Sequence, residues 1–231
     1  MGEQIQINTE GTHCIGAYVA RPRDKPLGGI VVVQEIFGVN AWVRSAVDRF
    51  AASGYVAIAP AFFDHLETGV ELDYGEKSFA RGKALVGEVG FDRAIADVAA
   101  AAQSIASAGR IGVVGYCWGG TIALLSAIRL GMPAASYYGA RNVQFLDQPL
   151  AAPVQFHFGE QDGSIPAAAV QRHREDYARA IAAGEVEVFT YAGAGHAFDR
   201  DVDPTHYAPA ASQRARERTL AFFARRLDAG A

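Results

Sequence analysis

The chain has 231 residues, half of them hydrophobic and one fifth charged, with a formal net charge of −4. This length suits one substantial core and is too short for two comfortable domains, so we expect a single domain over residues 1–231. The absence of any Lys and Arg cluster argues against nucleic-acid binding, and no apolar run approaches the roughly 20 residues of a membrane span.

Apolar runs rich in Val and Ile alternate with helical patterns, which is typical of a mostly parallel sheet flanked by helices on both faces. Strands are predicted at residues 4–7 and 16–20, as an antiparallel pair, and at 29–33, 55–59, 110–114, 134–138, 153–158 and 186–191. Helices are predicted from about residue 40, over 76–107 with a break near Gly87 and Gly90, from just after Gly120, and over 167–183 and 210–226. In such an α/β fold the catalytic groups lie on loops at the carboxyl ends of the strands.

A cysteine occupies the turn between the strand that ends near residue 114 and the helix that follows. Cys117 has Gly115 two residues before it and Gly119 two residues after it. This spacing is typical of a nucleophile elbow, where strand and helix approach so closely that a β-carbon would clash. Free cysteine is also a common core residue, but the elbow would expose the thiol. The phosphate-loop alternative lacks the required Lys-Ser or Lys-Thr pair.

Two later loops each offer one titratable group. Asp162 follows the strand predicted at 153–158, and His196 follows the strand predicted at 186–191. Each residue alone suits an ordinary turn or loop. Together with Cys117 they stand in the order nucleophile, acid, base, which is the order of α/β-hydrolases. We therefore predict a catalytic triad of Cys117, Asp162 and His196.

A thiol must lose its proton before it can attack an ester. His196 would accept the Cys117 proton, and Asp162 would fix the imidazole tautomer. Attack on an ester carbonyl then forms a thioester through an oxyanion. We expect the backbone N–H of Trp118, at the positive end of a helix, and an N–H of the loop over residues 34–40 to stabilise that oxyanion.

Four motifs resemble the dienelactone hydrolase family, and the likeness spans the chain. They are Gln-Glu-Ile-Phe-Gly-Val-Asn at 34–40, Gly-Tyr-Cys-Trp-Gly-Gly at 115–120, the Gly-x-x-Asp loop of Asp162, and Ala-Gly-His-x-Phe around His196 with Arg200 four residues beyond it. The resemblance implies an α/β-hydrolase fold and hydrolysis of dienelactone, a cyclic enol ester carrying a carboxylate, to maleylacetate. It implies neither a metal nor a cofactor.

The resemblance also assigns roles to individual residues. Glu35 would contact the resting thiol and take its proton when substrate arrives, and the Ile36 backbone would be the second oxyanion donor. Arg200 would clamp the substrate carboxylate. We also expect Phe37 and Tyr138 in the substrate site. The alternative interpretation of Glu35 is a salt bridge to an arginine.

The chain departs from the family pattern around the substrate. An arginine and, four residues later, a tyrosine usually hold the substrate carboxylate, but Gly75 and Phe79 stand at the matching places. Lys77, Arg81 and Tyr74 are near enough to substitute for them, although each also suits a solvated helix face. Ala197, Gly82 and Ser164 replace a serine and two bulky pocket side chains of the family pattern. The sequence therefore predicts the type of reaction more closely than the identity of the substrate.

Two alternatives to a dienelactone hydrolase stay open. One is an esterase or lactonase for an uncharged substrate, and the other is a non-hydrolytic thiol sensor or binding protein in which Cys117 responds to oxidants. We expect a monomer that acts on a small molecule. The first residues lack a secretion signal and the cysteines form no disulfide framework, so a cytoplasmic location is expected.

The remaining histidines have ordinary interpretations. His157 is expected on a core strand and His173 on a surface helix, while His13, His65 and His206 are expected in turns or loops. His13 and Cys14 are adjacent, but a structural zinc site usually takes four ligands at regular spacing.

Overall fold

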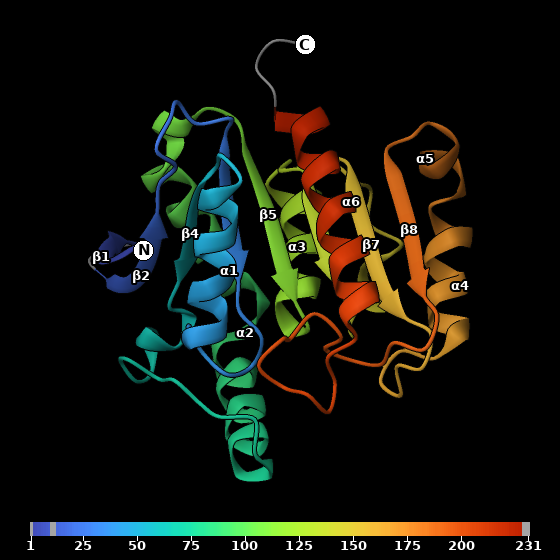
Figure 1. Cartoon of the computed structure of the whole chain (residues 1–231), viewed down its shortest axis with the longest axis horizontal. Helices are drawn as coiled ribbons and strands as arrows, with labels where there is room; N and C mark the ends of the chain where they lie inside the picture. The colour runs from blue at the N-terminus through green and yellow to red at the C-terminus, as the bar shows by residue number, and fades with distance from the viewer. Residues whose placement is uncertain (1, 10–12, 228–231) are drawn as a thin grey trace. The chain divides into compact units, whose positions relative to one another are not determined.

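A computed structural model describes residues 2–9 and 13–227 of the chain (Figure 1). The chain divides into two compact units, and we call residues 1–113 with 227–231 unit 1 and residues 114–226 unit 2. Strand β5 (Ile111–Tyr116) runs through the division, so its first half belongs to unit 1 and its second half to unit 2.

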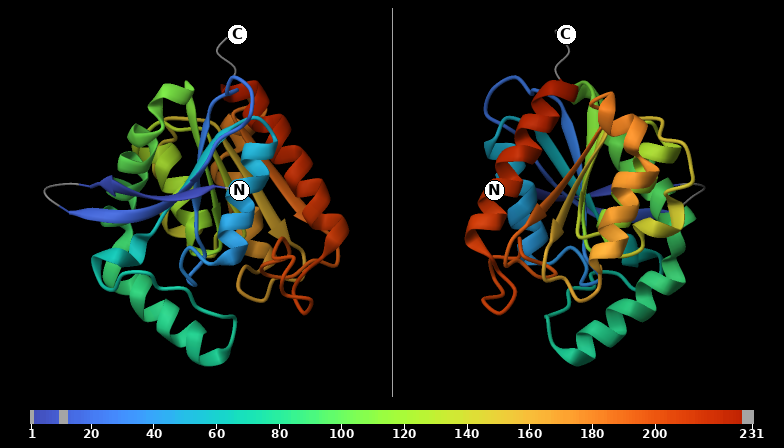
Figure 2. Two further views of the ribbon diagram at one scale, coloured as in Figure 1. Left: turned by 60° about the vertical axis from the view of Figure 1, so that its left-hand side comes forward. Right: turned by 90° about the vertical axis from the view of Figure 1, so that its right-hand side faces the viewer.

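Unit 1 places β1 (Glu3–Asn8), β2 (Cys14–Ala20), β4 (Val56–Pro60) and β3 (Gly29–Val33) side by side, in that order. The β1–β2 and β2–β4 pairs are antiparallel, whereas β3 and β4 are parallel. Helices α1 (Ala41–Ala52) and α2 (Glu76–Ser104) cover opposite faces of these strands (Figures 1 and 2). The short 3-10 helices η1 (Phe62–His65) and η2 (Ala106–Ala108) complete the described part of the unit.

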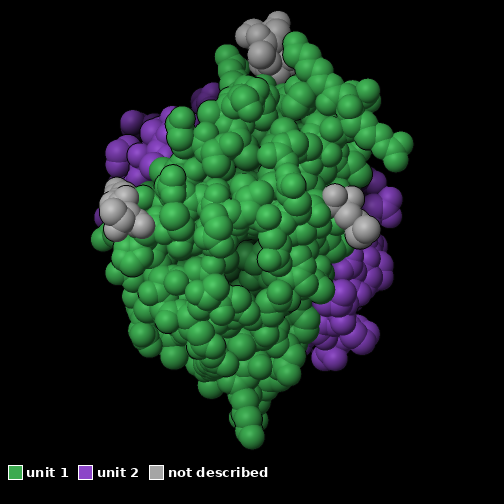
Figure 3. All heavy atoms as spheres, turned by 90° about the vertical axis from the view of Figure 1, so that its left-hand side faces the viewer, with its two compact units in different colours: residues 1–113, 227–231 green, residues 114–226 purple. Residues whose placement is uncertain are grey.

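Unit 2 continues from β5 through β6 (Ala134–Tyr137), β7 (Val154–Gly159) and β8 (Val186–Tyr191), with parallel pairing from β6 to β8. Helix α3 (Trp118–Arg129) lies on the face opposite to α6 (Pro209–Leu227) (Figure 2). The connections carry η3 (Asn142–Phe145), α4 (Ala167–Asp176) and α5 (Ala178–Ala182). Figure 3 colours the two units separately.

The eight predicted strands are present. Strands β3 and β8 have the predicted bounds, and the ends of the other six differ by one or two residues. All five residues of β3 are apolar or glycine and buried. The predicted break in the long helix is also present, since Gly90 has φ 70° and ψ 173° inside α2. A left-handed φ of this kind is accessible to glycine at little cost.

One predicted helix is wrong. The pattern over residues 167–183 was expected to form a single helix, but α4 ends before Tyr177 and α5 begins after it. Tyr177 has φ −102° and ψ 20°, outside the helical region, and its ring stacks on Phe156 with centroids 6.1 Å apart. Burial of this large ring therefore accompanies the interruption of the helix.

Along residues 2–9 and 13–227, no helix has both the length and the apolar character needed to cross a bilayer.

Candidate active site

Cys117 sits at the junction of β5 and α3 in a strained backbone conformation, with φ 56° and ψ −114°. A β-carbon on Gly115 would lie 1.8 Å from the Gly119 carbonyl oxygen, and one on Gly120 would lie 2.4 Å from the Tyr137 carbonyl oxygen. That carbonyl also accepts a hydrogen bond from the Cys117 backbone N–H at 3.0 Å. Close backbone contacts thus hold the cysteine at the tip of the turn.

His196 and Asp162 lie beside Cys117 in a hydrogen-bonded row. His196 Nε2 is 3.2 Å from Cys117 Sγ, and His196 Nδ1 is 2.7 Å from Asp162 Oδ2. The second oxygen of Asp162 accepts the backbone N–H of Ser164 at 2.8 Å. The Asp162 side chain is fully buried, whereas 24% of the His196 side chain is exposed. This arrangement can take a proton from the thiol and keep the imidazole in one tautomer.

The surroundings of His196 favour its charged form. Burial alone would lower the pKa of His196, but the negative charge of the Cys117 thiolate and the hydrogen bond with Asp162 outweigh it and raise that pKa to about 10. The imidazolium form of His196 is therefore favoured whenever Cys117 carries a negative charge.

Two further residues of unit 2 that were predicted for the site lie close to the row. Trp118 is the first residue of α3, which places its backbone N–H at the positive end of the helix. The fully buried Tyr138 has a left-handed φ of 38°, and its ring centroid lies 5.1 Å from that of His196. Tyr138 therefore forms one wall around the imidazole.

Glu35, Ile36 and Phe37 belong to unit 1, in the loop that follows β3, and all three are buried. This loop makes close backbone contacts at two glycines. Gly38 has φ 81°, and a β-carbon on it would lie 1.9 Å from the Val70 carbonyl oxygen. A β-carbon on Gly82 of α2 would lie 2.1 Å from the Ile36 carbonyl oxygen, so this position has no room for a larger side chain.

The candidate carboxylate clamp, Arg200, is itself in an ion pair. Its side chain is 7% exposed, and its Nη2 lies 3.2 Å from Asp203 Oδ2, the oxygen that also lies 2.7 Å from His206 Nδ1. Burial raises the pKa of Asp203, but the hydrogen bond with His206 and the Arg200 charge outweigh it and lower that pKa. The Asp203 carboxylate therefore already forms an ion pair with the Arg200 guanidinium, the group predicted to bind the substrate carboxylate.

The possible substitutes for the missing arginine and tyrosine make different contacts. Arg81 forms an ion pair with Glu67, and Tyr74 accepts a hydrogen bond from Asn40 Nδ2 at 3.2 Å. The Tyr74 ring also packs on Phe37, with centroids 4.9 Å apart. Lys77 is exposed on the first turn of α2.

The expected surface position of His173 is wrong, because this side chain is fully buried. It lies on the inner face of α4, with its ring 4.8 Å from those of Phe156 and Phe158. His157 is buried in the core as expected. Burial lowers the pKa of His157 to about 3 and that of His173 to about 4, so both are neutral.

Three residues around the site were missed by sequence reasoning. Tyr137 holds the Cys117 backbone, and Asp199 with Arg216 ties the loop after His196 to α6. The last two stand 17 residues apart and carry no local motif. Within the described part of the chain, no group of three or more His, Cys, Asp or Glu side chains is arranged to hold a metal ion.

Comparison with known proteins gives one consistent family. The model of the dienelactone hydrolase family matches residues 15–227. The carboxymethylenebutenolidases of Pseudomonas putida and Pseudomonas knackmussii are each 34% identical over 230 residues, covering 96% of this chain and 96% of theirs.

Solved structures agree with the sequence matches. A crystal structure from Klebsiella pneumoniae, assigned as a dienelactone hydrolase, has a TM-score of 0.86 at 32% identity and covers 97% of this chain and 98% of its own. A dienelactone hydrolase-like promiscuous phosphotriesterase from metagenomic libraries shares the fold, with a TM-score of 0.76 at 18% identity. The predicted α/β-hydrolase fold is confirmed, and the chain belongs to the dienelactone hydrolase family.

Proposed function

We propose that this protein hydrolyses a small lactone or enol ester through a thioester on Cys117. Its family and relatives indicate a hydrolase acting on ester or lactone bonds. The observation that carries the cysteine mechanism is the row from Cys117 Sγ through His196 to Asp162, with separations of 3.2 Å and 2.7 Å. These distances allow the proton transfers that a triad requires.

Acylation begins with addition of the Cys117 thiolate to the substrate carbonyl carbon. The resulting oxyanion accepts a hydrogen bond from the Trp118 N–H, and from the Ile36 N–H by resemblance to the family. Collapse of this intermediate breaks the bond between the carbonyl carbon and the ring oxygen. The released enolate or alkoxide oxygen takes the proton from His196, which leaves a thioester on Cys117.

In deacylation a water molecule attacks the thioester, and His196 acts first as a proton acceptor rather than as a proton donor. His196 takes a proton from a water molecule as its oxygen adds to the thioester carbonyl, and the second oxyanion uses the same donors. Collapse breaks the carbon–sulfur bond. The product is released as an acid that loses its remaining proton to solvent and becomes a carboxylate, and the proton on His196 balances the thiolate on Cys117.

Glu35 is the proposed activator of the thiol, a role that comes from the family resemblance. Its burial supports a role inside the protein rather than a surface salt bridge. Replacement by Gln keeps the shape of the side chain and removes its ability to take a proton. If Glu35 activates the thiol only when substrate is bound, Glu35→Gln lowers kcat strongly and leaves the iodoacetamide reactivity of the resting enzyme nearly unchanged.

Two substrate classes fit this site. The family resemblance favours a carboxylated lactone such as dienelactone, with Arg200 holding the carboxylate. The Arg200–Asp203 ion pair favours the second class, an uncharged ester, because an acidic side chain already neutralises the guanidinium.

The test compares matched lactones and aryl esters, with and without a carboxylate, on the wild type and on Arg200→Ala. Loss of kcat/KM confined to the anionic substrates supports the carboxylated class, whereas equal kcat/KM in both proteins supports the uncharged class. Cys117→Ala must remove turnover of every active substrate. Normal turnover by that variant would overturn the proposed cysteine mechanism.

A further inference from the structure

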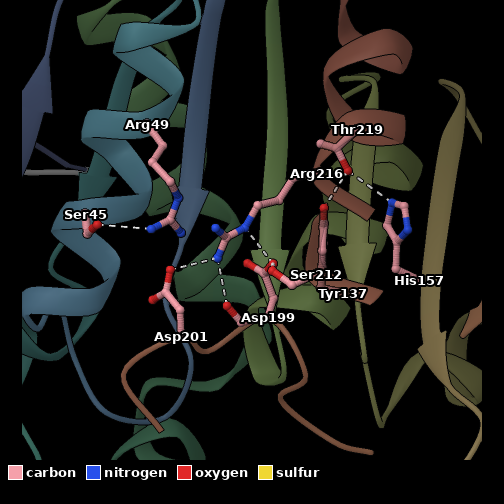
Figure 4. Close-up of polar contacts among 9 residues, drawn as sticks. All are labelled: Ser45, Arg49, Tyr137, His157, Asp199, Asp201, Ser212, Arg216 and Thr219. Carbon is pink, nitrogen blue, oxygen red and sulfur yellow. Dashed lines mark hydrogen bonds and ion pairs between the residues drawn. The ribbon is translucent and has the colours of Figure 1, made fainter. Parts of the chain in front are cut away.

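The loop that carries His196 continues into a buried charged contact with α6. Asp199 lies three residues after His196 and is fully buried. Its Oδ1 accepts hydrogen bonds from Ser212 Oγ at 2.6 Å and from Arg216 Nε at 2.7 Å (Figure 4). Hydrogen bonds between charged groups are stronger than neutral ones, and burial protects them from solvent screening. The loop is therefore held firmly at this point.

Arg216 also holds the main chain of the same loop. Its Nη2 donates to the Asp199 carbonyl oxygen at 2.9 Å and to Asp201 Oδ2 at 3.1 Å. One guanidinium thus contacts the side chain of Asp199, the backbone of Asp199 and a second carboxylate. Burial would lower the pKa of Arg216, but the Asp199 charge outweighs it, so the guanidinium stays charged. A planar guanidinium with several fixed donors defines the position of the loop in more than one direction.

The same face of α6 also contacts the strand end behind the nucleophile. Ser212, Arg216 and Thr219 are spaced i, i+4 and i+7, which places them on one side of a helix. Thr219 Oγ1 is 2.7 Å from Tyr137 Oη (Figure 4), and the Tyr137 carbonyl accepts the Cys117 N–H. Helix α6 is therefore in contact with both segments whose spacing sets the distance between sulfur and imidazole.

We propose that Arg216 and Asp199 are positioning residues that fix the His196 loop on α6 and so hold His196 Nε2 within reach of Cys117 Sγ. The inference rests on the proposed triad and adds to it a structural requirement outside the reacting groups. A displacement of about 1 Å at a reacting group can cost about 100-fold in rate. Loss of the Arg216 contacts is expected to lower the rate of chemistry rather than the binding of substrate.

The main test replaces Arg216 with Met, which keeps an unbranched apolar stem and removes the guanidinium with its donors. Arg214→Met is the matched control, because Arg214 is on the same helix with 65% of its side chain exposed. We expect Arg216→Met to lower kcat for an aryl acetate by about 10- to 100-fold, with KM within about twofold of wild type. Arg216→Lys should recover part of kcat, and Arg214→Met should match the wild type.

A second readout separates positioning from simple loss of structure. Iodoacetamide alkylation of Cys117 is followed against pH, at a temperature where circular dichroism shows every variant to be folded. The wild type and Arg214→Met should be alkylated at the same rate at each pH. In Arg216→Met the rate should differ from wild type, because His196 Nε2 is no longer held 3.2 Å from Cys117 Sγ. A folded Arg216→Met with wild-type kcat and alkylation profile overturns the inference.

Ser212→Ala is the second variant, since it removes a single hydrogen bond to Asp199 and keeps the ion pair. It should give a smaller fall in kcat in the same direction, and unchanged kcat in this variant would contradict the inference if Arg216→Met does not fold. Full activity of Cys117→Ala would instead overturn the proposed cysteine mechanism, so the two failures are distinguishable.

Discussion

Cys117 differs from the serine of most nucleophile elbows by one atom, and this atom changes what the neighbouring histidine does. A cysteine thiol ordinarily has a pKa of about 8.5, close enough to that of an imidazole for the proton to pass between the two groups near neutral pH. The 3.2 Å separation of Cys117 Sγ and His196 Nε2 suits this exchange. At this scale the proposed chemistry depends on an ion pair that a serine would not form at neutral pH.

The pKa of His196 should depend on the sulfur. Cys117→Ala removes the thiolate charge that raises this pKa, while the burial that lowers it remains, so the pKa should fall below the wild-type value of about 10. Titration of the His196 Cε1 proton by NMR measures it. Cys14→Ala is the control, because Cys14 is exposed. An unchanged His196 pKa in Cys117→Ala would contradict the ion-pair description.

At the scale of elements, the sequence was most informative where local signals define a turn. Cys117, Asp162 and His196 each follow an apolar run and lie in a loop with glycine, so their places at strand ends could be predicted. The break at Tyr177 and the burial of His173 could not, because both depend on packing against β7. The hydrophobic periodicity of a segment carries no information about its tertiary contacts with another strand.

Gly82 carries a sequence signal for a close approach between helix α2 and a neighbouring segment. Glycine inside a helix is unfavourable by about 1 kcal/mol relative to alanine, so its presence in α2 indicates a close approach. The structure identifies that approach as the Ile36 carbonyl, 2.1 Å from where a β-carbon would stand. The contact between Asp199 and Arg216, in contrast, had no comparable signal in either segment.

The loop after β3 should be sensitive to one methyl group. In Gly38→Ala the new β-carbon would collide with the Val70 carbonyl oxygen in a backbone with φ 81°, so the free energy of unfolding should fall by about 3 kcal/mol. Gly69→Ala is the control, since it has a similar φ of 72° and nothing within 4 Å of the added atom. It should cost only about 1 kcal/mol. Equal losses in urea unfolding would rule out the collision as the cause.

At the scale of the whole molecule, buried neutral histidines make stability depend on pH. The pKa of His157 is lowered to about 3 and that of His173 to about 4, from 6.5 in both cases. The unfolded chain therefore binds these protons at a higher pH than the folded protein does. Their contribution to stability is complete above pH 6.5 and is lost as the pH falls towards 3 to 4.

Replacing one of these histidines should reduce the acid sensitivity. His173→Phe keeps an aromatic ring between Phe156 and Phe158 and removes the titrating group. Between pH 7 and pH 5 the variant should lose about 2 kcal/mol less unfolding free energy than the wild type, as measured by urea unfolding at each pH. The same loss in both proteins would show that His173 does not contribute to this pH dependence.

The most direct test of the proposed mechanism is mass spectrometry of the enzyme quenched during turnover of an aryl acetate. The proposed mechanism predicts one acetyl group per chain on the peptide that contains Cys117, released by hydroxylamine and absent in Cys117→Ala. An acetyl group on another residue, or turnover by Cys117→Ala at the wild-type rate, would contradict it.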